Sequence, residues 1–174
     1  MAAIPSSGMT TTLAIAMQAL PIYCAWGAGY AAWDSAPIPA NSESPGLVAE
    51  IGRRRVDAQL FCTPSVSGDI HLPPSANNPG GRWAISNAPT PFLYLKTSFH
   101  SEDSPAALIR EVGYFSGTVI KSSVSVQQSY FAPADLANQG RIFVTDRFVH
   151  IQRSPDFTQT FQFVMDFSKV FQPL

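Results

Sequence analysis

Three histidines, His71, His100 and His150, are the chain's only imidazole groups, and His150 has a carboxylate nearby in sequence. Asp146 precedes it by four residues on a predicted strand, so both side chains would share one face of that strand, with Phe148 between them. Such a pair can act as a general base, but hydrolysis also needs a nucleophile or a positioned water. The nucleophile-elbow pattern Gly-x-Ser-x-Gly does not occur. We therefore expect His150 to face the surface or a partner.

Glu102 and Asp103 are adjacent carboxylates in the predicted loop SEDSP (101–105). A glycosidase needs two carboxyl groups that face each other across the scissile bond. Adjacent acids point in different directions, so a solvated turn is the favoured interpretation. The turn Gly27-Ala28-Gly29 lacks the third glycine and the helix of a dinucleotide-binding loop. These patterns favour a protein without enzymatic activity.

The two cysteines, Cys24 and Cys62, lie in apolar stretches of predicted strand. Their position favours buried thiols in a protein made in a reducing cytoplasm, and a disulfide between them is the alternative. Two isolated cysteines and scattered histidines have no metal-ligand spacing. We expect no metal and no cofactor.

A run of three arginines, Arg53, Arg54 and Arg55, falls on a predicted strand. Arg53 and Arg55 would face one side and Arg54 the other. If one face is core, at least one guanidinium must be covered by a carboxylate of this chain or of a partner. The alternative is an exposed edge strand, on which cations deter wrong pairing. The sequence leaves both interpretations open.

The elements that carry these residues begin with a predicted helix over 8–20. Its apolar residues recur at helical spacing, Ser7 or Thr10 can cap it, and Pro21 ends it. A helix of about three turns is marginal alone in water, so its apolar face must dock on other structure. That face consists of Met9, Leu13, Ala16, Met17 and Leu20.

Alternating or apolar runs predict strands over most of the remaining chain. The stretch 48–62 has a predicted bulge at Gly52, and 159–167 has the clearest period of two, with a short helical turn expected at 134–138. The apolar residues on one face of that last strand are Phe161, Phe163, Met165 and Phe167, and further strands are predicted at 22–26, 92–99, 107–117 and 141–151.

These elements predict a mainly β fold, with an antiparallel, sandwich-like β domain, a short N-terminal helix and an extended proline-rich arm. The expected segments are 1–33 for the helix and first strand, 34–47 for the proline-rich linker and 48–174 for the β domain. Together they would form one globular unit, since 174 residues fit a single domain.

Composition points to burial in an assembly. Charged residues make up only 13% of the chain, well below the roughly 25% of ordinary soluble domains. A surface with so few charges is poorly soluble unless partner chains cover it. With a net charge of −1 and no basic run beyond residues 53–55, we do not expect nucleic-acid binding as the main task. The first 33 residues carry no charge and no basic leader region, and the interrupted apolar stretch predicts no membrane span.

The order of several short motifs resembles virion proteins of tailed bacteriophages. Gly8 and Leu13 fit the helix of tail-collar fibre-attachment domains, and Gly27 and Gly29 fit the glycine turn that follows it. The stretch 109–115, IREVGYF, is similar to a later strand of those domains. Baseplate wedge proteins also have a Trp-Asp and a Pro-x-Pro after such a turn; here these are Trp33-Asp34 and Pro37-x-Pro39. The resemblance covers residues 8–117.

This resemblance implies a structural protein of the phage tail, a baseplate or fibre-attachment component made in the host cytoplasm. Its partners would be other virion tail proteins, in several copies around a ring or wedge, with no nucleic acid. Large aromatic residues dominate interface energetics, so two tryptophans and the linker prolines are the expected contacts, with three arginines as candidates for ion pairs inside or between chains. These interface candidates are Trp26, Trp33, Pro37, Pro39, Arg53, Arg55 and Arg110.

Three other functions stay open at this point. A carbohydrate-binding β-sandwich could stack sugars on Trp26, Trp33 and Trp83 beside the loop 71–82. A connector in the neck between head and tail is a second alternative. A glycan hydrolase, which would depend on Glu102, Asp103 and His150, ranks last.

Overall fold

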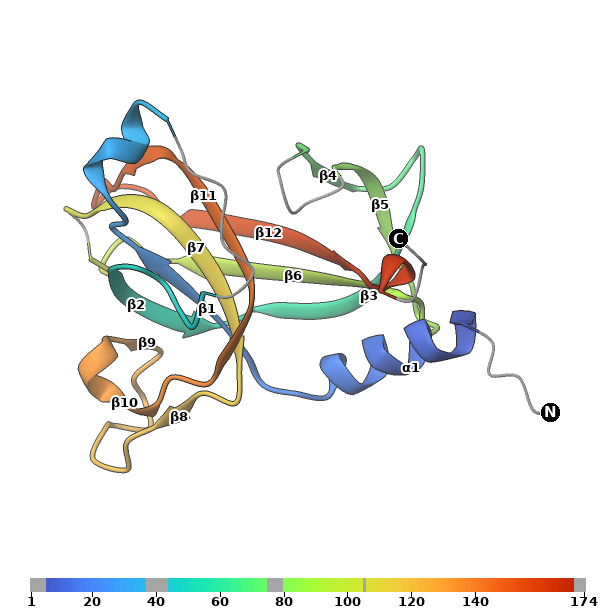
Figure 1. Ribbon diagram of the computed structural model, residues 1–174, viewed down its shortest axis with the longest axis horizontal. Coiled ribbons are helices and arrows are strands. Elements are labelled where there is room, and N and C mark those ends of the chain that lie inside the picture. Colours follow the sequence, from blue (N-terminus) through green and yellow to red (C-terminus); the bar gives the residue numbers. More distant parts are fainter. Residues whose placement is uncertain (1–5, 37–43, 75–79, 105, 171–174) are drawn as a thin grey trace. The chain divides into compact units, whose positions relative to one another are not determined.

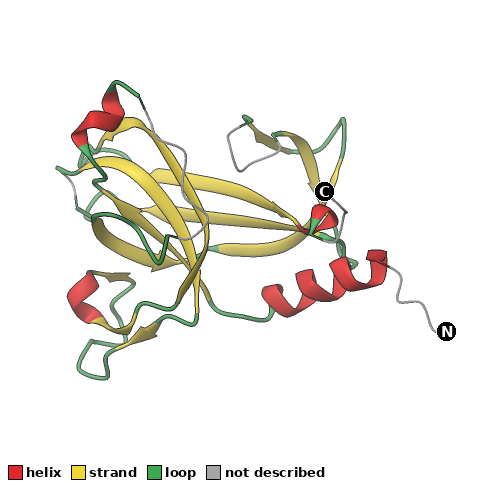
Figure 2. Ribbon diagram, in the orientation of Figure 1, coloured by secondary structure: helices red, strands yellow, loops and turns green. Residues whose placement is uncertain are grey.

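The structure is a computed structural model that describes residues 6–36, 44–74, 80–104 and 106–170. The chain is mainly β, and each strand pair with a described register is antiparallel (Figure 1). Figure 2 shows how little of the described chain is helical. The helical elements are α1 (Ser6–Gln18) and the 3-10 turns η1 (Ala31–Asp34), η2 (Pro133–Asp135) and η3 (Phe167–Lys169). The prediction of a mainly β, antiparallel fold with a short N-terminal helix is confirmed.

Two compact units make up the chain, and each combines segments that are far apart in sequence. Unit 1 contains Met1–Leu20, Asp57–Lys96 and Gln162–Leu174; unit 2 contains Pro21–Val56 and Thr97–Phe161. The boundary between the units cuts two strands, β6 (Phe92–Phe99) and β12 (Gln159–Asp166). The expected segments 1–33, 34–47 and 48–174 divide the chain at other positions.

Unit 1 is built on a sheet with the strand order β12-β6-β3-β5-β4. Its central strand β3 (Ala58–Pro64) pairs with β6 through its first half and with β5 (Gly81–Ile85) through its second half. The short strand β4 (Ile70–Leu72) completes the hairpin with β5. Leu60 lies opposite Tyr94 and Cys62 opposite Ile85, so these four side chains share one face of the sheet.

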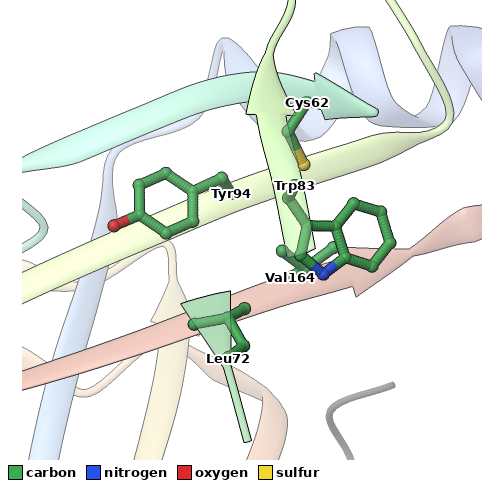
Figure 3. Close-up of a cluster of buried hydrophobic side chains, with 5 residues drawn as sticks. All are labelled: Cys62, Leu72, Trp83, Tyr94 and Val164. Atoms are coloured by element: carbon green, nitrogen blue, oxygen red, sulfur yellow. The ribbon is translucent and has the colours of Figure 1, made fainter. Parts of the chain in front are cut away.

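A small hydrophobic core forms on that face of the sheet, with one buried residue from each of the five strands (Figure 3). The Trp83 indole N–H donates to the Gly80 carbonyl (3.0 Å), which satisfies the ring's one polar group inside the core. The Tyr94 hydroxyl donates to Gln162 Oε1 (2.6 Å), and burial raises its pKa. The core residues are Cys62, Leu72, Trp83, Tyr94 and Val164.

Helix α1 forms where the sequence predicts it, but the predicted buried face is wrong. Thr10 and Ala14 are the buried positions, whereas Met9 and Leu20 are exposed. At 100° per residue the buried face is turned by roughly a quarter turn from the predicted apolar stripe. The small side chains of Thr10 and Ala14 allow close approach, and α1 packs against η3. The largest apolar residues of the helix therefore do not determine its docked face.

The C-terminal end of α1 is capped from β3 by the side chain of Gln59. Its Nε2 lies within hydrogen-bonding distance of the carbonyls of Met17 (2.8 Å), Gln18 (2.8 Å) and Leu20 (3.0 Å), so these three acceptors share its two N–H donors. The last carbonyls of a helix have no partner within the helix, and Pro21 prevents the helix from continuing. One strand residue thus satisfies the end of α1 and fixes it to the sheet.

Unit 2 is built on a sheet with the strand order β11-β7-β1-β2-β9. A two-stranded ladder of β8 (Val119–Ile120) and β10 (Leu136–Asn138) accompanies it. The central strand β1 is paired on both sides, and its residues Ile22, Cys24, Ala25 and Trp26 are completely buried. The sheet strands are β1 (Ile22–Gly27), β2 (Glu50–Arg55), β7 (Leu108–Ser116), β9 (Tyr130–Phe131) and β11 (Arg141–Gln152).

The predicted bulge at Gly52 is confirmed. Trp26 lies opposite Gly52 but Gly27 lies opposite Glu50, so β2 has one extra residue at this point. A Cβ on Gly52 would lie 2.2 Å from the Tyr130 hydroxyl oxygen. Glycine is therefore required here by the close approach of a neighbouring side chain.

Most predicted strands agree with the structure within one or two residues. The stretch 48–62 is divided, because Val56 N donates to Ile22 O in unit 2 while Asp57 N donates to Lys96 O in unit 1. The period of two in β12 is confirmed at Phe163 and Met165. On its other face, between the polar residues Gln162 and Asp166, Val164 is also completely buried. The helical turn expected at 134–138 is η2 followed by β10.

We predict that Gln59→Ala lowers the free energy of unfolding by about 1–2 kcal/mol, because it leaves the carbonyls at the end of α1 without their donor. Urea denaturation followed by circular dichroism measures this change. Gln127→Ala is the matched control at an exposed position and should change the free energy by less than about 0.5 kcal/mol. Equal effects of the two substitutions would contradict the capping role.

We predict that both cysteines resist alkylation in the folded protein. Both thiols are completely buried, and burial raises the pKa of the Cys62 thiol to about 12. The thiolate is the reactive form, so iodoacetamide at pH 8 should modify neither residue until urea unfolds the chain. Intact-mass spectrometry counts the adducts, and rapid modification of native Cys62 would contradict the prediction.

Candidate partner-binding site

The chain leaves β1 through a crowded glycine turn. A Cβ on Gly27 would lie 2.5 Å from Glu111 Oε1, and Gly29 has φ +54° with the Trp33 ring packed against it. Glu111 is completely buried and accepts the backbone N–H of Ala49 (3.0 Å). These close contacts explain the Gly-x-Gly pattern by packing, and they direct the chain into η1.

Arg110 on β7 holds η1 in place. Its Nε and Nη2 donate to the two carboxylate oxygens of Asp34, both at 2.8 Å, and its Nη1 donates to the Ala28 carbonyl (3.1 Å). This two-point pairing is the strongest form of arginine–carboxylate contact. The Arg110 guanidinium is the main reason that the pKa of Asp34 lies far below its ordinary value of 3.8, and a contact with His150 adds to the effect. Asp34 in turn raises the pKa of Arg110.

Strand β11 lies beside η1 (Figure 1) and contributes His150 and Arg147 to the contacts around Asp34 and Trp33. His150 Nδ1 lies 3.0 Å from Asp34 Oδ1, and the His150 backbone N–H donates to the same oxygen (3.2 Å). The Arg147 guanidinium lies over the Trp33 ring, 4.6 Å from its centre, in a cation–π contact. The sequence predicted that Asp146 lies on the same face of the strand as His150. In the structure the carboxylate partner of His150 is Asp34.

We call this cluster the η1 corner. Trp33 is its buried centre, at 2% exposure, and Tyr30 packs edge-on against it with the ring centres 5.5 Å apart. Tyr30 itself is 59% exposed. In this arrangement ion pairs hold the Asp34 carboxylate, and the exposed Tyr30 ring packs on the buried Trp33. Such a site suits binding better than acid–base chemistry. The η1 corner consists of Tyr30, Trp33, Asp34, Arg110, Arg147 and His150.

Arg53 of the triple-arginine run is completely buried. Its Nε and Nη2 donate to the carboxylate of Glu50 on the same strand (2.8 and 2.7 Å), and its Nη1 donates to Thr118 Oγ1 (2.7 Å) and to the Gln139 carbonyl (2.6 Å). The guanidinium also lies 4.1 Å above the centre of the Phe115 ring. The ion pairs expected of Arg53 and Arg110 are therefore formed within this chain.

Arg54 and Arg55 differ sharply in environment. Arg54 is buried, and its Nη1 donates to Asp103 (2.6 Å) while its Nη2 donates to Ser129 (3.0 Å). Arg55 is exposed at the end of β2. Of the two interpretations left open by the sequence, carboxylate-covered core arginines hold for Arg53 and Arg54.

The Trp26 ring is inaccessible to a ligand. Its ring is completely buried and stacks on Phe99 at 3.8 Å, and its indole N–H donates to the Tyr130 hydroxyl (3.0 Å). Trp33 is 2% exposed and Trp83 is 4% exposed. The carbohydrate-binding alternative needs open tryptophan faces, so the three rings it depends on are ruled out as a stacking platform.

Glu102 and Asp103 do not form a catalytic pair. Asp103 is buried and paired with Arg54, and it also accepts the His100 backbone N–H (2.7 Å). Glu102 is exposed, and hydrogen bonding from its own backbone is the main cause that lowers its pKa. A general acid needs the opposite shift.

The structure adds a residue that the sequence reasoning missed. Arg153 is buried directly after β11 and lies over the Trp26 ring, 5.0 Å from its centre. A lone arginine between a predicted strand and a Ser-Pro turn is the signal that identifies it. Pro37 and Pro39 lie outside the described residues.

Two kinds of site are absent from the described residues. No helix in this part of the chain is long and apolar enough to cross a membrane. Over the same residues, no three histidine, cysteine or acidic side chains are grouped so as to hold a metal ion.

Comparison with known proteins links this chain to one family. A family model with the description "Baseplate wedge 3 tail fiber network component" matches residues 1–167. No curated protein matches the chain. The matched region runs through α1, both units and the whole of β12.

We predict that Asp34→Asn lowers the thermal midpoint at pH 7, because it removes the charged partner of Arg110. The folded-state pKa of Asp34 is depressed, so its contribution to stability is present above pH 3.8 and is lost as the pH falls below that value. The difference in midpoint between the wild type and Asp34→Asn should therefore shrink on acidification from pH 7 to pH 3.

Scanning calorimetry over that pH range measures the effect. Asp69→Asn serves as the control, since Asp69 is exposed and makes no ion pair among the described residues. A wild-type advantage over Asp34→Asn that is equal at pH 7 and pH 3 would contradict the ion-pair argument.

Proposed function

Because the chain belongs to the family of baseplate wedge 3 tail fiber network components, we propose that it is a structural subunit that holds neighbouring baseplate or fibre-attachment proteins together. Family membership carries this proposal, and it confirms the identification as a phage baseplate protein that the sequence motifs suggested. In this function the protein resides in the virion tail and is made in the host cytoplasm. Its partners are other tail proteins, in several copies around a ring or wedge.

Composition and burial support a structural task. Only 13% of the residues are charged, and four of the eight arginines are buried, so the surface carries still fewer charges than the composition indicates. Interfaces are depleted of charge at their centres. A surface of this kind is suited to lie against other chains.

The predicted contact residues take two different parts in this proposal. Arg55 is exposed, and we assign it to direct contact together with Tyr30, an exposed residue of the η1 corner that was not among the predicted contacts. Trp26, Trp33, Arg53 and Arg110 are buried and act by holding the contact segments in shape. Pro37 and Pro39 are proposed contacts that rest on the sequence alone.

A structural subunit of this kind acts without catalysis or a cofactor. The imidazole of His150 and the carboxylates of Asp34 and Asp103 are engaged in ion pairs or hydrogen bonds, which suits fixed architecture rather than proton transfer. The neck-protein alternative has no observation in its favour, and the family description favours the baseplate.

The proposal predicts that phage particles made without this chain have defective baseplates or lack fibres. A phage with the gene deleted, grown with and without plasmid-encoded wild-type chain, is compared by cryo-electron microscopy and by infectious titre. The plasmid copy should restore both baseplate density and titre. Complete, fibre-bearing tails in the absence of the chain would overturn the proposal.

A further inference from the structure

Arg153 connects two loops at one end of unit 2. Its Nη1 donates to the Phe157 carbonyl (2.8 Å), and its Nη2 donates to the His100 carbonyl (2.7 Å). Arg153 is only 4% exposed, and its guanidinium packs over the Trp26 ring. One buried cation therefore fixes the loop before β7 and the loop before β12.

The same guanidinium is electrostatically costly where it lies. No carboxylate of the described residues pairs with Arg153, and its Nε has no hydrogen-bond partner among them. A buried charge without an opposite charge destabilises a fold, and an apolar side chain of similar size would pack on Trp26 at lower cost. What only an arginine supplies here is the forked donor that positions two loop carbonyls at once.

The loop that Arg153 holds presents Phe157. This ring is 69% exposed, more than any other aromatic side chain of the described residues. Local hydrogen bonds shape the turn beneath it, where the Ser154 hydroxyl donates to Asp156 (3.2 Å) and accepts the Asp156 backbone N–H (3.3 Å). Exposed aromatic rings on preorganised turns lose little entropy on binding and are typical interface anchors.

The two loops that Arg153 connects expose acidic side chains. Glu102 and Asp156 are exposed in the two loops, and neither loop exposes a lysine or an arginine, because Arg153 is buried. A partner surface that receives the ring is therefore best matched by an apolar pocket with basic residues on its rim.

We propose that Phe157 anchors this chain in an apolar, basic-rimmed pocket of a neighbouring tail protein, and that Arg153 is the positioning residue that holds the anchor. The proposal rests on the structural function in the baseplate. It adds which surface makes the contact and what chemistry the partner surface has.

The experiment uses the gene-deleted phage, with the full-length chain supplied from a plasmid. Phe157→Asp should reduce the amount of this chain in purified virions by about tenfold or more, since loss of an anchor of this kind commonly exceeds a factor of ten. Val126→Asp is the matched control, because Val126 is 99% exposed in another loop of unit 2, outside the two loops that Arg153 connects. Quantitative mass spectrometry of the virions should give a wild-type level for this control.

A second variant separates positioning from folding. Arg153→Met removes the charge and the two donors but keeps an apolar contact with Trp26. We expect its thermal midpoint to stay within about 3 °C of the wild type while incorporation into virions falls with that of Phe157→Asp. A parallel loss of thermal stability and incorporation would show a merely structural role and would overturn the positioning assignment.

The outcomes distinguish this inference from the proposed function. Absence of the wild-type chain from virions would refute the structural function itself. If the wild-type chain is present and Phe157→Asp is incorporated equally well, only the anchor is refuted. A dimer of the purified chain that Phe157→Asp abolishes would overturn the assignment of the pocket to a different protein.

Discussion

The ion pair between Arg53 and Glu50 is the interaction on which unit 2 depends most. Both residues belong to β2, and the completely buried guanidinium takes both carboxylate oxygens. Its remaining Nη1 reaches Thr118 and the carbonyl of Gln139, which lie outside β2. The pair thus neutralises a charge inside the sheet and ties distant irregular segments to it. Removal of one partner would leave a buried charge, at a cost of about 3–5 kcal/mol.

The same device recurs around the sheet. Arg54 reaches Asp103, and Arg110 reaches Asp34, which is 76 residues away in sequence. In each case the carboxylate lies in a loop or a 3-10 turn, and the arginine lies on a strand. Irregular segments cannot satisfy themselves through a sheet ladder, so ion pairs from the strands give these segments a fixed conformation. A large share of this chain's few charged side chains is therefore buried.

Sequence reasoning predicted what local periodicity determines. The strands β6, β7, β11 and β12 and the existence of α1 follow from alternation, proline positions and helical spacing, and the bulge follows from Gly52. Contacts between segments that are distant in sequence could not be predicted. The docked face of α1 is set by its packing against η3 and by Gln59 on β3, neither of which is a helix signal. The partner of His150 is likewise nonlocal, because it is Asp34 and not Asp146, which lies on the same strand as His150.

Trp26 and Trp33 illustrate this difference most clearly, because both were expected to contact partner proteins directly. Both rings are buried, yet each one stacks with an arginine beneath a segment that carries an exposed aromatic side chain. Trp33 packs with Arg147 and supports Tyr30, and Trp26 packs with Arg153, which holds the backbone of Phe157. Cation–π stacking keeps an indole and a guanidinium in one geometry without a carboxylate. A rigid interior of this kind lets a single surface ring bind with little loss of conformational entropy. The contribution of the tryptophans to partner binding is therefore indirect, through the shape of the segments that they support.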